Sequence, residues 1–171
     1  MYRFISLFIV FSIVTTSQIV GQGQDNFVKV QNGTDAPGFT VKTIDGGLIS
    51  LDQLRGKTVI LTFFATWCSP CMEELPHLER LYKQHKSNGL VILCIGREHQ
   101  LAELQLFNQT KSFTFNIAAD PDRKIYQQYA DKFIPRTFVI DRNGKILYQS
   151  TGYNPEEFSK MEKVVISEIK R

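Results

Sequence analysis

Two apolar runs with an amphipathic segment between them constrain the fold of this chain more than any other feature. Residues 58–64 and 90–95 are rich in β-branched and aromatic side chains without polar alternation, which is typical of strands buried on both faces of a sheet. Between them, residues 69–87 place apolar side chains three or four positions apart and end at Asn88-Gly89, a typical helix C-terminus. A strand, a helix and a strand in this order predict a right-handed parallel crossover, and therefore an α/β fold.

Turn-forming residues indicate two β-hairpins outside this unit. Short strand patterns around Asp45-Gly46-Gly47 predict a hairpin at the start of the domain, and Asn143-Gly144 between residues 137–140 and 145–149 predicts another. The other elements that we expect are a helix near 100–109, a strand near 115–118, a short helix over 122–129 and a helix over 155–169. No internal repeat or low-complexity tract interrupts this order.

The first residues differ from the rest of the chain. Arg3 precedes an apolar run from Phe4 to Val14, and small polar residues follow at 15–17, a pattern typical of a secretory signal peptide. An uncleaved membrane anchor is the alternative, although the apolar run is shorter than the roughly 20 residues that a spanning helix needs. We therefore expect an exported protein. The expected division is a signal peptide over residues 1–22, with an approximate cleavage point, an extended lead-in over 23–36 and one domain over 37–171.

Composition and charge exclude several classes of function. An apolar content of 43% in 171 residues is enough for one hydrophobic core without disulfides or metals. The 20 basic and 17 acidic residues are scattered along the chain, so we expect no nucleic-acid partner. Three cysteines, an odd number in a chain of this length, do not form a disulfide scaffold. The closely spaced pair of cysteines therefore needs another role.

That pair, Cys68 and Cys71, lies where the first buried strand passes into the helix. A thiol at a helix N-terminus faces unpaired backbone N–H groups and the positive end of the helix dipole, which lower its pKa. Cys71 follows three residues later on the same side, within reach of a mixed disulfide formed at Cys68. The spacing predicts a dithiol in which Cys68 attacks a substrate and Cys71 resolves the intermediate.

A zinc site and a structural disulfide are the alternatives for Cys-x-x-Cys. The remaining candidates, Cys94, His77, His85 and His99, offer no second pair at zinc-ligand spacing. A bridge that closes so short a loop contributes little stability through chain entropy. We expect no metal and no cofactor. We expect Cys94, inside an apolar run, to be an inert core thiol, and the three histidines to occupy surface or helix positions.

Around the dithiol the sequence resembles the TlpA/ResA-like branch of thioredoxin-fold thiol-disulfide oxidoreductases. The resemblance covers nearly all of the chain after the signal peptide. It rests on Ala36-Pro37-Gly38-Phe39, Leu54-Arg55-Gly56-Lys57, Phe64-Ala65-Thr66-Trp67-Cys68-Ser69-Pro70-Cys71, Glu74-Leu75-Pro76 and Ile134-Pro135-Arg136-Thr137-Phe138-Val139-Ile140-Asp141. It implies a thioredoxin-like fold, with a central mixed β-sheet flanked by helices and an N-terminal β-hairpin, and a redox-active disulfide between Cys68 and Cys71.

The resemblance also implies roles for residues near the dithiol. Trp67 would lie beside it, Pro70 would shape its turn and Pro76 would kink the helix. Pro135 resembles the family's cis-proline, which lies opposite the dithiol and exposes backbone groups to an extended substrate, so Trp67, Ile134 and Pro135 are the expected substrate-binding residues. A trans proline at the start of the following strand is the alternative.

Glu74 is the third expected catalytic residue. Thioredoxins place a buried aspartate six residues before the first cysteine, where this chain has Thr62. The resemblance implies that Glu74 takes over proton transfer, and helical spacing sets it one turn beyond Cys71. Glu73 is expected to face solvent.

Two rival functions share this fold. Peroxiredoxins carry a proline seven residues and a threonine or serine three residues before the attacking cysteine, but here these positions hold Leu61 and Ala65. Copper-delivering relatives have a longer cysteine spacing and a downstream histidine that we do not find. Peroxidase activity and a metal-binding role are therefore the less favoured alternatives.

The direction of the reaction is open at the level of sequence. The resemblance favours a reductase that passes electrons to exported proteins such as apocytochromes, in the bacterial periplasm or on the outer face of the cytoplasmic membrane. An oxidase that forms disulfides is the alternative, because thioredoxin-fold proteins span potentials from about −270 to about −120 mV. The expected partners are protein thiols or disulfides and a membrane electron donor, and we expect a monomer.

Overall fold

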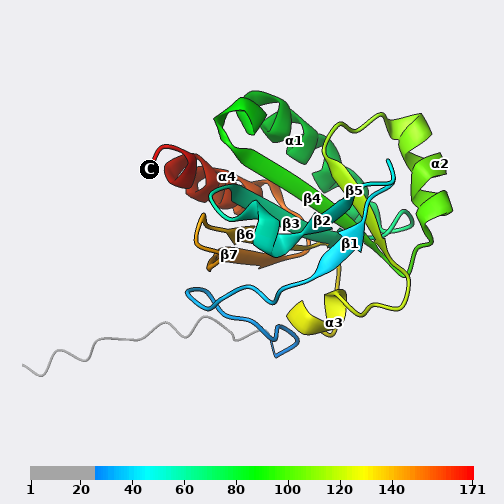
Figure 1. Cartoon of the computed structure of the whole chain (residues 1–171), viewed down its shortest axis with the longest axis horizontal. Helices are drawn as coiled ribbons and strands as arrows, with labels where there is room; N and C mark the ends of the chain where they lie inside the picture. Colours follow the sequence, from blue (N-terminus) through cyan, green and yellow to red (C-terminus); the bar gives the residue numbers. More distant parts are fainter. Residues whose placement is uncertain (1–25) are drawn as a thin grey trace, which may run out of the picture.

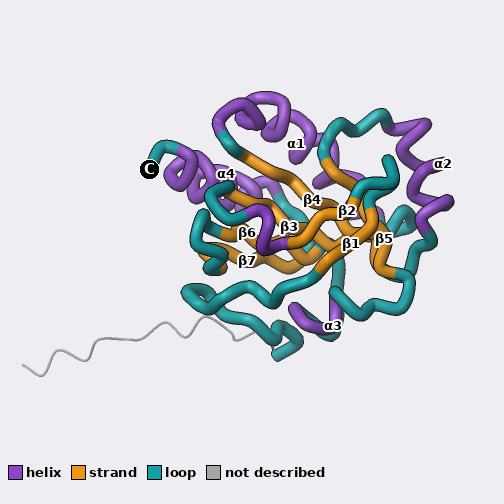
Figure 2. Tube along the Cα trace, in the orientation of Figure 1, coloured by secondary structure: helices purple, strands orange, loops and turns teal. Residues whose placement is uncertain are grey.

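The computed structural model describes residues 26–171, so the predicted signal peptide lies outside the described residues. Figure 1 shows the elements in chain order, and Figure 2 shows the strands gathered in the centre with the helices around them. The strands are β1 (Thr40–Lys42), β2 (Leu48–Ser50), β3 (Thr58–Phe64), β4 (Leu90–Arg97), β5 (Asn116–Asp120), β6 (Arg136–Ile140) and β7 (Ile146–Thr151). The helices are α1 (Ser69–His85), α2 (Leu101–Lys111), α3 (Tyr126–Tyr129) and α4 (Pro155–Ile169), with 3₁₀ turns at Leu51–Leu54 and Lys86–Asn88.

Five strands form a mixed sheet in the order β5-β4-β3-β6-β7. Strand β3 pairs in parallel with β4 through the crossover helix α1, which confirms the predicted strand-helix-strand unit. Strand β6 runs antiparallel to both β3 and β7, and β1 and β2 form the predicted N-terminal hairpin. Because β6 is antiparallel to β3, its first residues lie beside the last residues of β3, with Thr62 opposite Thr137. This register brings the segment before β6 to the start of α1.

Both faces of the sheet are covered. Helices α1, α2 and α4 pack on one face, where residues such as Ile60, Leu78 and Val165 form one hydrophobic cluster. The hairpin, α3 and the segment before β1 cover the other face, where Leu61 and Tyr129 belong to a second cluster. Every residue of β3 is buried, as predicted for a central strand.

The segment before β1 packs against the domain. Val28 forms a β-bridge with Ala130, and Asp35 forms another with Lys145. Ala36 is 7% exposed and belongs to the second cluster. Part of the predicted lead-in therefore contributes to the core.

Helix α3 is shorter than the helix predicted over 122–129. The carboxylate of Asp120 accepts hydrogen bonds from the N–H groups of Ile125 and Tyr126, and Arg123 has a left-handed φ of 60°. A left-handed residue cannot continue an α-helix, so residues 121–124 form a turn and the prediction was wrong there.

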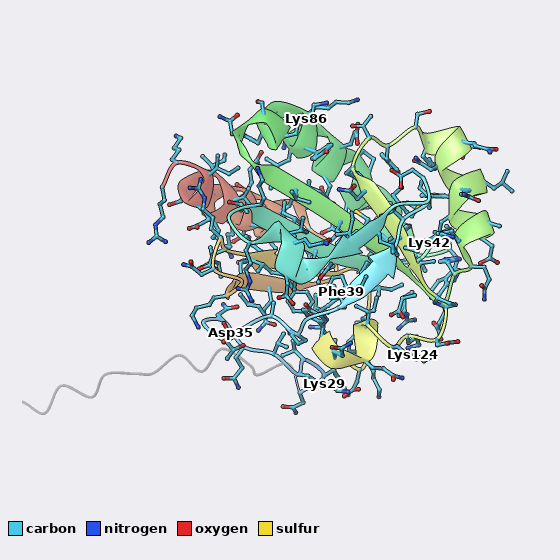
Figure 3. The ribbon with its side chains drawn as sticks, in the orientation of Figure 1. Lys29, Asp35, Phe39, Lys42, Lys86 and Lys124 are labelled. Atoms are coloured by element: carbon cyan, nitrogen blue, oxygen red, sulfur yellow. A yellow bond between two sulfur atoms is a disulfide. The ribbon has the colours of Figure 1, made fainter. Side chains whose placement is uncertain are left out.

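The four lysines labelled in Figure 3 are spread over the surface. The exposed side chains of Lys86 and Lys124 project from opposite sides of the molecule, and those of Lys29 and Lys42 from further sites around it (Figure 3). Within residues 26–171, no helix has the length and apolar character that crossing a membrane requires.

Candidate active site

A tight turn over residues 65–68, here called the redox turn, connects β3 to α1. The N–H of Cys68 donates to the carbonyl of Ala65 at 3.1 Å. Cys68 is the N-cap of α1, and its sulfur accepts a hydrogen bond from the N–H of Cys71 at 3.3 Å. Pro70 lies in the first turn of the helix, where its missing N–H has no intrahelical partner to lose. The prediction that Cys68 begins the helix is confirmed.

Cys68 and Cys71 form a disulfide with an S–S distance of 2.07 Å. Cys68 is 6% exposed, whereas Cys71 has no exposed surface. An incoming thiolate therefore reaches Cys68 first. Trp67 is 66% exposed, which excludes an ordinary core aromatic at this position.

The segment before β6 lies directly against the dithiol. The peptide bond between Ile134 and Pro135 is cis, as predicted, and the Ile134 carbonyl oxygen lies 3.6 Å from the Cys68 sulfur. Ile134 is half-buried, and the neighbouring Phe133 is 54% exposed. The backbone of this segment is thus placed beside the sulfur that a substrate would approach.

Glu74 belongs to a buried triad with Thr62 and Thr137. Its carboxylate accepts hydrogen bonds from the Thr137 hydroxyl at 2.8 Å and the Thr62 hydroxyl at 3.2 Å. Glu74 is 2% exposed, and both threonines are fully buried. Burial raises the pKa of Glu74 from 4.5 to about 7, although the bonds from Thr137 and Thr62 act to lower it. This carboxyl group can therefore gain or lose a proton near neutral pH.

Comparisons with known proteins agree with this geometry. The sequence profile of the AhpC/TSA family matches residues 32–149. The thiol-disulfide oxidoreductase ResA of Bacillus thuringiensis is 34% identical over 129 residues, which cover 75% of this chain and 75% of that protein. The ResA of Bacillus subtilis is 33% identical over 72% of this chain and 69% of its own length. The chain is a ResA-like thiol-disulfide oxidoreductase of the AhpC/TSA family.

Solved structures place the ResA-like chain among thioredoxin-fold proteins. A solution structure of a candidate protein disulfide isomerase from Bacteroides thetaiotaomicron superposes with a TM-score of 0.81 at 34% identity, over 85% of this chain and 94% of that one. A crystal structure of a candidate thiol:disulfide interchange protein DsbE from Chlorobium tepidum gives a TM-score of 0.77 at 27% identity, over 82% and 99%. The predicted thioredoxin-like fold is confirmed.

The peroxidase alternative depends on two positions before the attacking cysteine. The two positions at which peroxiredoxins carry proline and threonine or serine hold Leu61 and Ala65, and neither residue has exposed surface. Apolar core side chains therefore occupy the places of the peroxide-binding groups. The residues of this ResA-like chain favour thiol-disulfide exchange.

Glu73 is exposed, as predicted, and Pro76 is an exposed residue in the interior of α1. Cys94 has no exposed surface, and burial, followed by the charge of Glu74, raises the pKa of its thiol. Its predicted place in the core is confirmed. Within residues 26–171, no group of three or more His, Cys, Asp or Glu side chains is arranged to hold a metal ion.

Sequence reasoning missed Thr137 and misplaced His99. Thr137 is a polar residue beside the apolar residues 138–140 of the predicted strand, which was the available signal for a buried polar contact. His99 was expected at a surface or helix position, but it is 6% exposed. Glu98 has a left-handed φ of 63°, which bends the chain after β4 and turns His99 inward to Thr66 of the redox turn. That expectation was wrong because a single left-handed residue such as Glu98 produces no periodic pattern in the sequence.

Proposed function

We propose that this ResA-like protein reduces disulfides in exported proteins, with Cys68 as the attacking thiol, Cys71 as the resolving thiol and Glu74 as the proton carrier. The observation that carries the proposal is the buried triad. A carboxyl group with a pKa of about 7 lies one helical turn beyond the fully buried Cys71. Proton transfer by a side chain is most effective when its pKa lies near the working pH.

The first step is attack of the Cys68 thiolate on a substrate disulfide. One substrate sulfur leaves as a thiolate and takes up a proton, and the other becomes bonded to Cys68. The exposure of Cys68 and its place at the start of α1 support this role, because the helix N-terminus stabilises the thiolate. The Ile134 carbonyl lies 3.6 Å from the sulfur, and Trp67, Ile134 and Pro135 are the proposed contacts for the substrate chain.

The second step is attack of Cys71 on the Cys68 sulfur. Cys71 must first lose a proton in a site without water contact, and the Glu74 carboxylate is the proposed acceptor. The second substrate sulfur leaves with a proton, so the substrate gains two electrons and Cys68 and Cys71 become a disulfide. Returning the protein to its dithiol form needs a two-electron donor, for which we propose a membrane protein.

Glu74 lines a small cavity beside the start of α4. A cavity of about 10 Å³, room for a single water molecule, is lined by Glu74 together with Tyr153 and Glu157 near the start of α4. It also touches Asn154, which is exposed. This cavity is the proposed exit for the proton taken from Cys71.

The reduction potential tests the direction of the reaction. The protein would be equilibrated with glutathione or dithiothreitol mixtures, and the fluorescence of Trp67, the sole tryptophan, would report the redox state. We expect a potential near that of thioredoxin, about −270 mV, whereas a value near −120 mV would make the protein an oxidant of exported thiols. A Cys71→Ser variant is the control that should show no two-electron transition.

The site of action needs its own test. The predicted signal peptide supports export, and apocytochromes are the proposed substrates among exported proteins. Expression of the full chain in a bacterium, followed by fractionation and N-terminal sequencing, should recover protein outside the cytoplasm. Recovery of the uncleaved chain from the cytoplasm would contradict the proposed location, and the mass in solution would test the proposed monomer.

A further inference from the structure

His99 makes a hydrogen bond to the redox turn. The backbone N–H of Thr66 donates to Nε2 of His99 at 3.1 Å, and the Thr66 hydroxyl lies 3.4 Å from the same nitrogen. A ring nitrogen that accepts a hydrogen bond from a backbone N–H carries no proton of its own. The ring proton is therefore assigned to Nδ1, which lies 3.4 Å from the carboxylate of Glu103.

Glu103 holds the other side of the ring in place. Its carboxylate accepts the N–H of Gln100 at 2.6 Å, and it is the capping residue of the first turn of α2. The hydrogen bond from Gln100, followed by the contact with His99, holds the pKa of Glu103 below its usual range. His99 thus lies between a helix N-terminus and the redox turn, and its ring is oriented from both sides.

Ala65 and Cys68, the ends of the redox turn, are buried in the hydrophobic core, whereas its two middle residues are less buried. Trp67, its third residue, is 66% exposed and packs on little of the protein. Within the turn, the N–H of Cys68 donates to Ala65, and the N–H of Thr66 donates to His99. The bond to His99 therefore ties the middle of the turn to the segment that follows β4.

We propose that His99 is a positioning residue that holds Thr66, and through it Trp67 and Cys68, in the geometry in which Cys68 and Cys71 exchange a disulfide. His99 does not touch the sulfur atoms. Its contribution is to keep the turn ordered. The free energy of forming the Cys68–Cys71 disulfide then does not include the cost of ordering the segment between β3 and Cys68. This inference rests on the exchange chemistry of the dithiol and is independent of the direction in which electrons flow.

Two substitutions separate this role from simple packing. In a His99→Gln variant the amide oxygen can take the place of Nε2 and accept the Thr66 N–H, whereas the shorter His99→Asn side chain places its polar atoms where Nδ1 was. Leu104→Ala is the matched control, because Leu104 is a fully buried residue of α2 and its truncation loosens that helix without removing the acceptor for Thr66.

The first readout is the equilibrium constant between each variant's dithiol and oxidised glutathione. We expect His99→Asn to lower the constant for forming the Cys68–Cys71 disulfide about threefold to tenfold, the range set by one net hydrogen bond. His99→Gln should stay close to the natural protein, and so should Leu104→Ala. Equal shifts in all three variants, or no shift in His99→Asn, would overturn the proposal.

A second readout needs no substitution. In the natural protein labelled with ¹⁵N, a scalar coupling across the N–H···N bond should join the Thr66 amide nitrogen to Nε2 of His99. Absence of that coupling, or a ¹⁵N shift showing a proton on Nε2, would also overturn the proposal. If the Cys71→Ser control still shows a two-electron transition, the exchange chemistry itself is wrong, and this outcome is distinct from a failure of the role of His99.

Discussion

Glu74 and Glu79 lie five residues apart on α1, and both are buried, yet their surroundings shift their pKa values in opposite directions. Glu74 is 2% exposed and accepts hydrogen bonds from two threonine hydroxyls. Glu79 is 9% exposed and accepts the N–H and the hydroxyl of Thr114, both at 2.8 Å, with the Lys83 ammonium at 3.0 Å. Burial raises the pKa of both carboxyl groups. For Glu79 the bonds from Thr114 and Lys83 outweigh burial and leave the pKa below its usual value, whereas that of Glu74 reaches about 7.

The difference separates a structural carboxylate from the proposed proton carrier in the same helix. A backbone N–H and an ammonium group favour the charged form of Glu79, which ties α1 to the segment before β5. A hydroxyl can donate to a carboxylate or accept from a protonated carboxyl, so Thr62 and Thr137 can serve both forms of Glu74.

The largest expected effect is on the pH dependence of stability. Since folding raises the pKa of Glu74 from 4.5 to about 7, its contribution to stability is complete below the unfolded pKa and is lost as pH rises through the folded pKa. The free energy of unfolding of the oxidised protein should therefore include a loss of about 3 kcal/mol between pH 4.5 and about 8. Glu79 has the opposite sign: its contribution is present above the unfolded pKa and is lost as pH falls through the lowered folded value.

Urea unfolding over this pH range measures the effect. A Glu74→Gln variant should lose the decline between pH 4.5 and 8, whereas Glu79→Gln should keep it and should lose instead the stabilisation that disappears in acid. If Glu74→Gln retained the same slope as the natural protein, the raised pKa of Glu74 would be refuted.

The second prediction concerns the rate of exchange. Replacing Glu74 with glutamine removes the proposed proton acceptor, and the resolving attack of Cys71 should slow about 100-fold, a typical contribution of a general base. Glu79→Gln, with an equally conservative change in the same helix, should leave the rate unchanged. Stopped-flow mixing of the reduced protein with a disulfide peptide, followed by Trp67 fluorescence, measures both. A Glu74→Gln variant with unchanged thiol pKa values and an unchanged rate would remove Glu74 from the mechanism.

The third prediction concerns Glu79, whose replacement should affect stability and not the dithiol. Glu79→Ala leaves the N–H of Thr114 and the charge of Lys83 without their partner, so the free energy of unfolding should fall by about 1–3 kcal/mol. The reduction potential of the Cys68–Cys71 pair should not move. A shift in this potential would show that Glu79 also acts on the dithiol and that the two carboxylates are not functionally distinct.

The sequence was most informative where a local pattern decides the structure. The apolar runs that became β3 and β4, the helix after Cys68 and the turn at Asn143-Gly144 were all predicted, because each follows from periodicity or turn chemistry within a short window. The cis-proline and the proton role of Glu74 came from the family resemblance. The structure confirms the cis bond and shows that Glu74 is buried, while the proton role stays a prediction.

The parts that were not predicted depend on contacts between distant segments. Thr137 meets Glu74 only because β6 pairs with β3 in a register that sets Thr62 opposite it. His99 reaches Thr66 because one left-handed residue, Glu98, bends the chain, and neither event has a periodic signature. The contrast between Glu74 and Glu79 belongs to the same class, since Thr114 lies 35 residues from its partner.

The smallest expected effect comes from paired threonine substitutions, which test whether the hydroxyls tune Glu74. Thr62→Val removes a donor that lowers the pKa of Glu74, so that pKa should rise further, and the pH at which the exchange rate increases should move up by about one unit. Thr114→Val is the matched control. Glu79 keeps the Thr114 N–H and Lys83, so it stays ionised and the rate profile should not move. A profile of rate against pH for both variants decides the matter, and a shift to lower pH in Thr62→Val, or equal shifts in both, would mean that the triad does not set the proton affinity of Glu74.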